Sequence, residues 1–189
     1  MRVQHLLRLT MLGSVSLLAA CGDSGTEPTP QNPFGDAAFT AAVTGDLATT
    51  FDGIAAFGTS TAADEFGFAL AMFPEDEDDE LQFISFYRDD AGVPAGNQHT
   101  IGNADAEETQ PETLYALAFI TNGTVTYACM STGGTTTFTS RATNRLEGTY
   151  SVTMDCTTLD VEAEDEEVLQ ITIAGTYKAI RGEVEQPVP

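Results

Sequence analysis

The fold is indicated most directly by one stretch, Leu146-Glu147-Gly148-Thr149-Tyr150-Ser151-Val152-Thr153-Met154-Asp155-Cys156. Every second residue in it is apolar or small, and the residues between are polar. This period of two is typical of a β-strand with one buried face and one face in water. Residues 168–180 alternate in the same way. We therefore expect Cys156 on the buried face of a sheet whose other face is wet.

Strand chemistry extends outward from this stretch. Thr, Phe, Tyr, Ile and Val dominate the apolar runs, and no part beyond residue 37 carries a sustained helical period. The pairs Asp52-Gly53, Asn122-Gly123 and Gly133-Gly134 predict turns between antiparallel neighbours. The predicted strands are 38–44, 47–51, 54–58, 65–73, 81–88, 113–121, 124–131, 135–141, 145–157 and 168–180.

This pattern predicts an all-β fold, an antiparallel β-sandwich of about 8–10 short strands, with a closed up-and-down β-barrel as the alternative. The last five strands should form a meander or most of one. Residues 81–87 and 114–120 are apolar on both faces, so we expect them to be central or covered on the outside. The triplets Gly148-Thr149-Tyr150 and Gly175-Thr176-Tyr177 are interpreted as common strand chemistry and not as duplication.

The charge balance restricts the partners. The 189 residues contain 29 acidic and 7 basic side chains, a net charge of -22. Binding to nucleic acid depends on clustered Lys and Arg, so nucleic acid is excluded as a partner. Such self-repulsion also suggests a salty or cation-rich setting.

Residues 1–20 have the layout of a signal peptide, with Arg2 and Arg8 before a short apolar run that ends in two alanines. The run from Leu9 to Ala20 reaches only about 18 Å as a helix, too short for a hydrocarbon core of ~30 Å. Residues 22–37 are rich in Pro and Gly and predict a flexible linker. The domains expected are therefore the signal peptide at 1–20, Cys21 with the linker at 21–37, a β-domain at 38–181 and a C-terminal tail at 182–189.

The end of the signal, Leu18-Ala19-Ala20-Cys21, resembles the lipobox of bacterial lipoproteins. The resemblance implies a diacylglyceryl group on the Cys21 thiol, cleavage after Ala20 and acylation of the new N-terminus, with chains such as palmitate. The partner would be a lipid bilayer, because two or more acyl chains anchor a protein stably. Gly22 follows the cysteine where an Asp would favour the inner membrane in some bacteria, so the resemblance implies the outer membrane or cell surface. Residues 38–181 also resemble small uncharacterised β-sandwich lipoproteins, which bring no known catalytic residues.

The cysteine count fits this anchoring. The chain has 3 Cys, and a lipidated Cys21 leaves Cys129 and Cys156 as one pair in a compartment that permits disulfides. Strand parity places both thiols on a buried face. A disulfide is expected, and two free buried thiols that act as small hydrophobes are the alternative.

Two acidic runs, 75–80 and 162–167, are the densest charge clusters. Carboxylates can hold Ca²⁺, and the candidate ligands are Glu75, Asp76, Asp78 and Asp79. The first run lacks the glycine and the final Glu of an EF-hand loop, so solvated loops that protect strand edges are the preferred interpretation, and no cofactor is expected.

Signals for catalysis are sparse. The one His beyond the signal is His99, which could act with Asp89 or Asp90 in a Ser-His-Asp set, but the chain has no Gly-x-Ser-x-Gly elbow. We expect a membrane-anchored exported lipoprotein with a non-catalytic binding or structural role in the envelope. The alternatives are a lipocalin-like barrel for a small apolar ligand, although the Gly-x-Trp of that family is absent from a chain without Trp, and a carboxylate-based hydrolase.

Overall fold

A computed structural model describes residues 35–60, 67–74, 82–90, 92–106, 110–159 and 168–182. In these ranges the chain forms β-strands and no helix, as the sequence predicts. The strands are β1 (Ala38–Gly45), β2 (Thr49–Thr59), β3 (Phe68–Phe73), β4 (Phe83–Arg88), β5 (Gln98–Ile101), β6 (Tyr115–Asn122), β7 (Val125–Ala142), β8 (Arg145–Thr158) and β9 (Leu169–Arg181).

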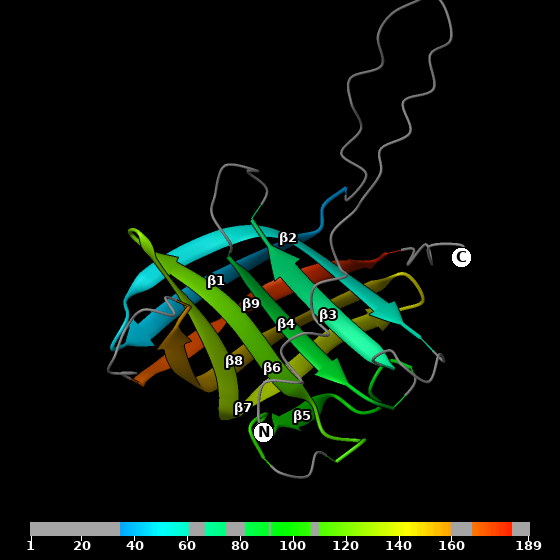
Figure 1. The fold of residues 1–189 in the computed structure, drawn as a ribbon. Coiled ribbons are helices and arrows are strands. Elements are labelled where there is room, and N and C mark those ends of the chain that lie inside the picture. The colour runs from blue at the N-terminus through cyan, green and yellow to red at the C-terminus, as the bar shows by residue number, and fades with distance from the viewer. Residues whose placement is uncertain are drawn as a thin grey trace, which may run out of the picture. The chain divides into compact units, whose positions relative to one another are not determined.

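Eight of the strands close into a barrel (Figure 1). Each strand in the series β1-β2-β3-β4-β6-β7-β8-β9 pairs antiparallel with the next, and β9 pairs antiparallel with β1. The short strand β5 adds to β7 outside this ring. The predicted sandwich is therefore wrong, and the alternative, an up-and-down barrel, matches the pairing. The two folds share the same alternation of side chains and differ only in whether the first strand bonds to the last.

The closure of the barrel continues beyond the first residue of β1. From Ala38 to Gly45, β1 lies between β2 and β9. Before β1 begins, β2 bonds directly to β9 in a parallel register, from Ala55 opposite Ala179 to Phe57 opposite Arg181. The ring therefore has no exposed edge at this seam.

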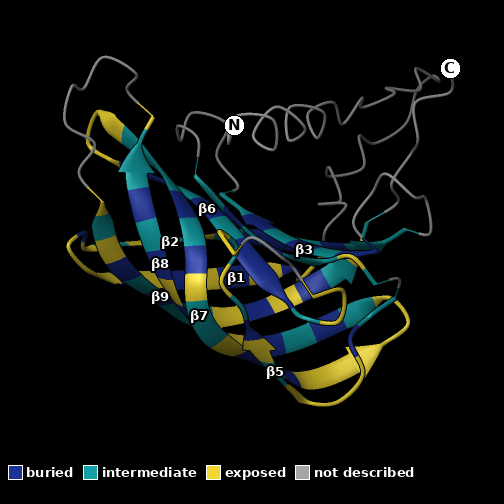
Figure 2. Ribbon diagram, turned by 60° about the horizontal axis from the view of Figure 1, so that its bottom comes forward, coloured by how far each residue is buried: buried dark blue, intermediate teal, exposed yellow. Residues whose placement is uncertain are grey.

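Inward side chains pack the interior of the barrel. Buried residues alternate along the strands (Figure 2), and aromatic rings meet across the centre: Phe86 and Tyr150 have ring centroids 5.4 Å apart, and Phe138 and Tyr177 6.3 Å apart. The largest side chains with almost no exposure are Tyr177, Phe39, Phe68, Phe86, Leu70, Met72, Ile84, Ile101, Leu114, Ile120, Leu146 and Met154. The barrel is thus built around a core of side chains.

Two of the predicted turns are wrong. Asp52-Gly53 lies inside the single strand β2, and Gly133-Gly134 lies inside the single strand β7. At Gly134, with φ of 144°, an added Cβ would lie 2.4 Å from the carbonyl oxygen of Ser151 in β8. The glycine therefore permits a close approach of two backbones, which a sequence pattern cannot distinguish from a turn. A turn at Asn122-Gly123 is confirmed between β6 and β7 but is shifted by one residue: Asn122 ends β6 and pairs with Val125, so Gly123, with a positive φ of 66°, and Thr124 form the loop. β6 to β9 form a meander of four strands, because the predicted strands 124–131 and 135–141 are both parts of β7.

The two Gly-Thr-Tyr triplets lie directly opposite one another. In the register of β8 and β9, Gly148 faces Tyr177 and Tyr150 faces Gly175. Each ring lies over the glycine of the other strand, because a Cβ on Gly148 would come within 2.3 Å of the Tyr177 hydroxyl. The Tyr150 hydroxyl continues across Gly175 to donate to the carbonyl oxygen of Thr40, 3.0 Å away. The triplets are thus one packing unit, a relation that their sequence similarity alone did not indicate.

The outer wall has two different faces. Over β3, β4 and β6 it is apolar, and the rings of Phe83 and Phe119 lie 5.1 Å apart on it. The expectation that residues 81–87 and 114–120 are covered is confirmed in part, since Tyr115 is buried against the segment that carries Gly102 and Gln110. Over β1, β9, β8 and β7 the outer wall instead carries short polar side chains, mostly Thr.

Candidate binding groove on the outer wall

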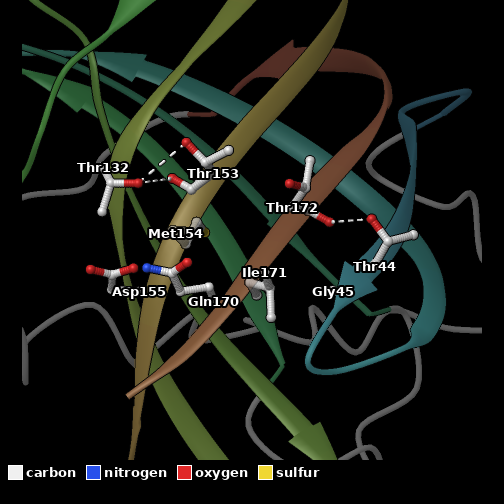
Figure 3. A pocket seen from close by; sticks show the side chains of 9 residues that line it. All are labelled: Thr44, Gly45, Thr132, Thr153, Met154, Asp155, Gln170, Ile171 and Thr172. Atoms are coloured by element: carbon white, nitrogen blue, oxygen red, sulfur yellow. Dashed lines mark hydrogen bonds between the residues drawn. The ribbon is translucent and has the colours of Figure 1, made fainter.

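An open depression of about 400 Å³ crosses this polar face. Its side chains come from β1, β7, β8 and β9 (Figure 3). Three of them lie in one row across the strands, since Thr44 pairs with Thr172, and Thr172 with Thr153. The complete lining is Thr44, Gly45, Thr132, Thr153, Met154, Asp155, Gln170, Ile171 and Thr172, and we call this depression the outer groove.

A β-bulge in β7 brings Thr132 into the outer groove. Ser131 pairs with Met154 and Gly133 pairs with Thr153, so Thr132 is the extra residue. Ser131 is fixed inward, where its hydroxyl donates to the Gly102 carbonyl oxygen at 2.8 Å and accepts from the Ala116 amide at 3.0 Å. Thr132 therefore points outward, in a bulge of the kind that redirects side chains beside functional sites.

Three of the four threonine hydroxyls that line the outer groove, those of Thr44, Thr132 and Thr153, direct their protons to the protein. Thr132 Oγ1 donates toward the carbonyl oxygen of Thr153 at 3.3 Å or its Oγ1 at 3.2 Å. Thr153 Oγ1 donates to the Gly133 carbonyl oxygen at 3.1 Å, and Thr44 Oγ1 to the Thr172 carbonyl oxygen at 3.4 Å. Because a hydroxyl has one proton and two lone pairs, these groups offer mainly acceptors to a ligand.

One carboxylate and one amide complete the polar lining. Asp155 on β8 lies opposite Gln170 on β9, and both side chains lie at the same end of the outer groove in Figure 3. The turn beside them is fixed by the Asp46 amide, which donates to the Gln170 carbonyl oxygen at 3.0 Å, and by the Gln170 amide, which donates to Asp46 Oδ2 at 2.8 Å. Among the described residues, Asp155 has no ion-pair partner. The outer groove therefore combines several acceptors with the amide donors of Gln170 and one carboxylate that has no ion-pair partner among the described residues.

The basic residues of the β-domain lie at the other end of the barrel. All five are in the described ranges: Arg88, Arg141, Arg145, Lys178 and Arg181. They lie at the start of β8 and at or near the ends of β4, β7 and β9, and the antiparallel order places these positions together at one end. The outer groove lies at the opposite end, where β1 ends at Gly45 and β9 begins at Leu169.

Several of these cations hold the barrel together. Arg141 donates to the carbonyl oxygens of Pro94, at 2.8 Å, and of Gly96, and it lies over the Phe138 ring. Arg145 pairs with Asp36 and with Glu147. Arg181 donates to Thr59 Oγ1 at 3.0 Å. Their charge is thus used within the protein, far from the outer groove.

The predicted disulfide is present in the structure. Cys129 on β7 and Cys156 on β8 face each other in the register and are bonded, with an S–S distance of 2.06 Å. Both are fully buried, as the strand parity predicts. Cys21 lies outside the described residues, and so do the Ca²⁺ candidates Glu75, Asp76, Asp78 and Asp79.

The catalytic candidates do not come together. His99 is half-buried in β5, where its Nε2 lies 3.2 Å from the Gly96 carbonyl oxygen and its ring packs against Phe138. Within the described ranges, His99 forms no ion pair or hydrogen bond with Asp89 or Asp90. Nor does any group of three or more His, Cys, Asp or Glu in these ranges have the geometry to hold a metal ion.

Sequence reasoning did not identify the outer groove. Its threonines alternate outward on strands that were predicted, but the position of Thr132 depends on a bulge and the row of Thr44, Thr172 and Thr153 depends on barrel closure. A second, smaller depression of about 280 Å³ lies over β2, β1 and β9 and includes Asp52. The sequence feature that could have predicted this polar face is the repeated Thr at the outward-facing positions of the strands.

Comparison with protein-family models, curated proteins and solved structures finds no match for this chain. The described part of the chain contains no apolar helix of membrane-spanning length.

Proposed function

We propose that this chain is an exported protein, anchored to the outer membrane or cell surface by acyl chains on Cys21, which binds a small polar ligand in the outer groove without catalysis. The observation that carries the binding role is the contrast between a packed interior and an open, acceptor-lined depression on the outer wall. The anchoring rests on the resemblance of Leu18-Ala19-Ala20-Cys21 to a lipobox.

The alternatives receive less support. A lipocalin-like barrel would need an enclosed apolar cavity, and in the described residues the positions that would line it are filled by Tyr150, Tyr177, Phe86 and their neighbours. A hydrolase would need a base beside a nucleophile or a matched pair of carboxylates in a cleft. The outer groove contains the single carboxylate Asp155 among its described lining.

Anchoring is tested by fatty-acid labelling in a bacterial host. The wild-type chain should incorporate a radioactive fatty acid and sediment with membranes, and Cys21→Ser should do neither. Gly22→Ala keeps the thiol and serves as the matched control. Unlabelled wild-type protein, or equal labelling of Cys21→Ser, would show that the chain is not lipidated at this residue.

A further inference from the structure

We infer that the outer groove binds an organic primary ammonium group attached to a short alkyl chain. This inference rests on the proposed binding role and specifies the ligand class. The volume of about 400 Å³ is within the range of roughly 300–1,000 Å³ of small-molecule sites, so a small amine fits it.

Hydrogen-bond polarity selects a ligand with many donors. The hydroxyls of Thr44, Thr132 and Thr153 direct their protons to backbone carbonyls or to each other, so their lone pairs face outward. The Asp155 carboxylate adds acceptors only. The Gln170 amide adds one acceptor oxygen and two N–H donors. A primary ammonium has three N–H donors and no acceptor, so it can bond to the outward-facing oxygens of this lining.

Electrostatics selects a cation over a neutral polyol. Asp155 has no ion-pair partner among the described residues, and the five basic residues of the β-domain lie at the opposite end of the barrel. Residues 21–189 contain 29 acidic and 5 basic side chains, so the chain without its signal carries a net charge of -24. A groove of one charge sign concentrates ligands of the opposite sign.

The remaining lining favours an alkylammonium over a metal ion. Ca²⁺ takes six to eight oxygen ligands, several of them usually carboxylates, whereas the outer groove has one carboxylate. Ile171 and Met154 face the barrel interior, so the apolar surface that the outer groove offers comes from the methyl groups of its threonines, beside their hydroxyls. An alkyl chain can lie along this surface while its ammonium group reaches the acceptors.

The probes are putrescine and its fully N-methylated analogue, tetramethylene-bis(trimethylammonium), titrated at constant ionic strength into residues 22–189 labelled with ¹⁵N. Both probes carry two positive charges on a four-carbon chain, but the methylated one has no N–H donor. We expect saturable putrescine-dependent shifts at Thr132, Thr153, Asp155 and Gln170, with the methylated analogue at least tenfold weaker. Equal affinity of the two cations would overturn the inference, and so would saturable binding of D-glucose at the same residues, which would indicate a neutral polyol site.

Variants then locate the interaction. Asp155→Asn should weaken putrescine binding about tenfold, because a charge-assisted hydrogen bond is lost. Asp89→Asn removes the same charge from an exposed turn after β4, at the other end of the barrel, and should bind like the wild type. Thr132→Val removes one acceptor with little change of shape and should weaken binding severalfold. Equal affinity of Asp155→Asn and Asp89→Asn would show nonspecific attraction to an acidic surface.

Failure of this inference is separable from failure of the proposed function. Fatty-acid labelling of Asp155→Asn should equal that of the wild type, since Asp155 lies in β8 and lipidation depends on Cys21. Labelled protein without putrescine binding would refute the ammonium ligand alone. Putrescine binding by a chain that is never labelled would refute the anchoring alone.

Discussion

Replacing Gly148 by Ala tests whether the two Gly-Thr-Tyr triplets act as one packing unit. A Cβ at this position would lie 2.3 Å from the Tyr177 hydroxyl and 2.4 Å from the Thr137 carbonyl oxygen, both far inside van der Waals contact. One neighbour is backbone within the β7–β8 ladder, so the Tyr177 ring and the strand pairing must both shift.

The expected loss of stability follows from three contributions. Overpacking a core costs about 1–3 kcal/mol. Displacement of Tyr177 also weakens its hydrogen bond to Thr136 Oγ1, 3.3 Å away, which is worth about 1 kcal/mol. In the opposite direction, Ala restricts the unfolded chain more than Gly does, which raises the free energy of unfolding by about 0.4–1 kcal/mol. The free energy of unfolding of Gly148→Ala should therefore fall by about 1–3.5 kcal/mol.

Urea unfolding followed by far-UV circular dichroism measures this loss, and Gly133→Ala is the matched control. Gly133 also lies in a strand, but a Cβ there would meet its nearest atom, Thr153 Oγ1, at an ordinary 3.6 Å. Its change should stay within about 0.5 kcal/mol. Adding Tyr177→Ala to Gly148→Ala should give a combined loss smaller than the sum of the single losses. Equal effects of the two glycine substitutions, or strict additivity with Tyr177→Ala, would refute the packing unit.

Two further predictions concern the interior. The double substitution Cys129→Ala and Cys156→Ala should lower the free energy of unfolding by about 3.5 kcal/mol, because the disulfide closes a loop across 27 positions in the unfolded chain. If reduction of the wild-type protein leaves its urea midpoint unchanged, this prediction is wrong. Burial raises the pKa of Tyr87 and of Tyr177 to about 12. The unfolded chain therefore loses these protons from about pH 10 while the folded chain retains them, so stability should be level below pH 10 and fall between pH 10 and 12. Urea midpoints at pH 8 and 11 measure the fall, Tyr177→Phe should make it shallower, and identical midpoints would disprove the linkage.

The sequence was informative wherever one face of a strand is buried and the other wet. Alternation in Leu146–Cys156 predicted β8 and the burial of Cys156, because a shift of one residue would reverse every side chain. The alternation could not distinguish a sandwich from a barrel, since closure depends on the pairing of β1 with β9. The alternation also misassigned Gly133-Gly134 as a turn. Both glycines lie within the bulged strand β7, where Gly134 allows the backbone to approach Ser151 of β8 closely. The sequence alone could not predict the outer groove, because the groove depends on the closure of the barrel between β1 and β9 and on the bulge in β7.

The distribution of charge explains why a ligand site can lie on the outside of a barrel whose interior is full. Eight strands enclose space that large side chains such as Phe86, Tyr150 and Tyr177 fill, so binding has to use the wall or the ends. Arg141 and Arg145 are engaged in contacts at the end opposite the outer groove. Asp155 is therefore left without an ion-pair partner among the described residues, on a wall where the hydroxyl protons of Thr44, Thr132 and Thr153 are already used. A bound ammonium group would supply a positive charge beside Asp155 and donors for the free lone pairs of these hydroxyls.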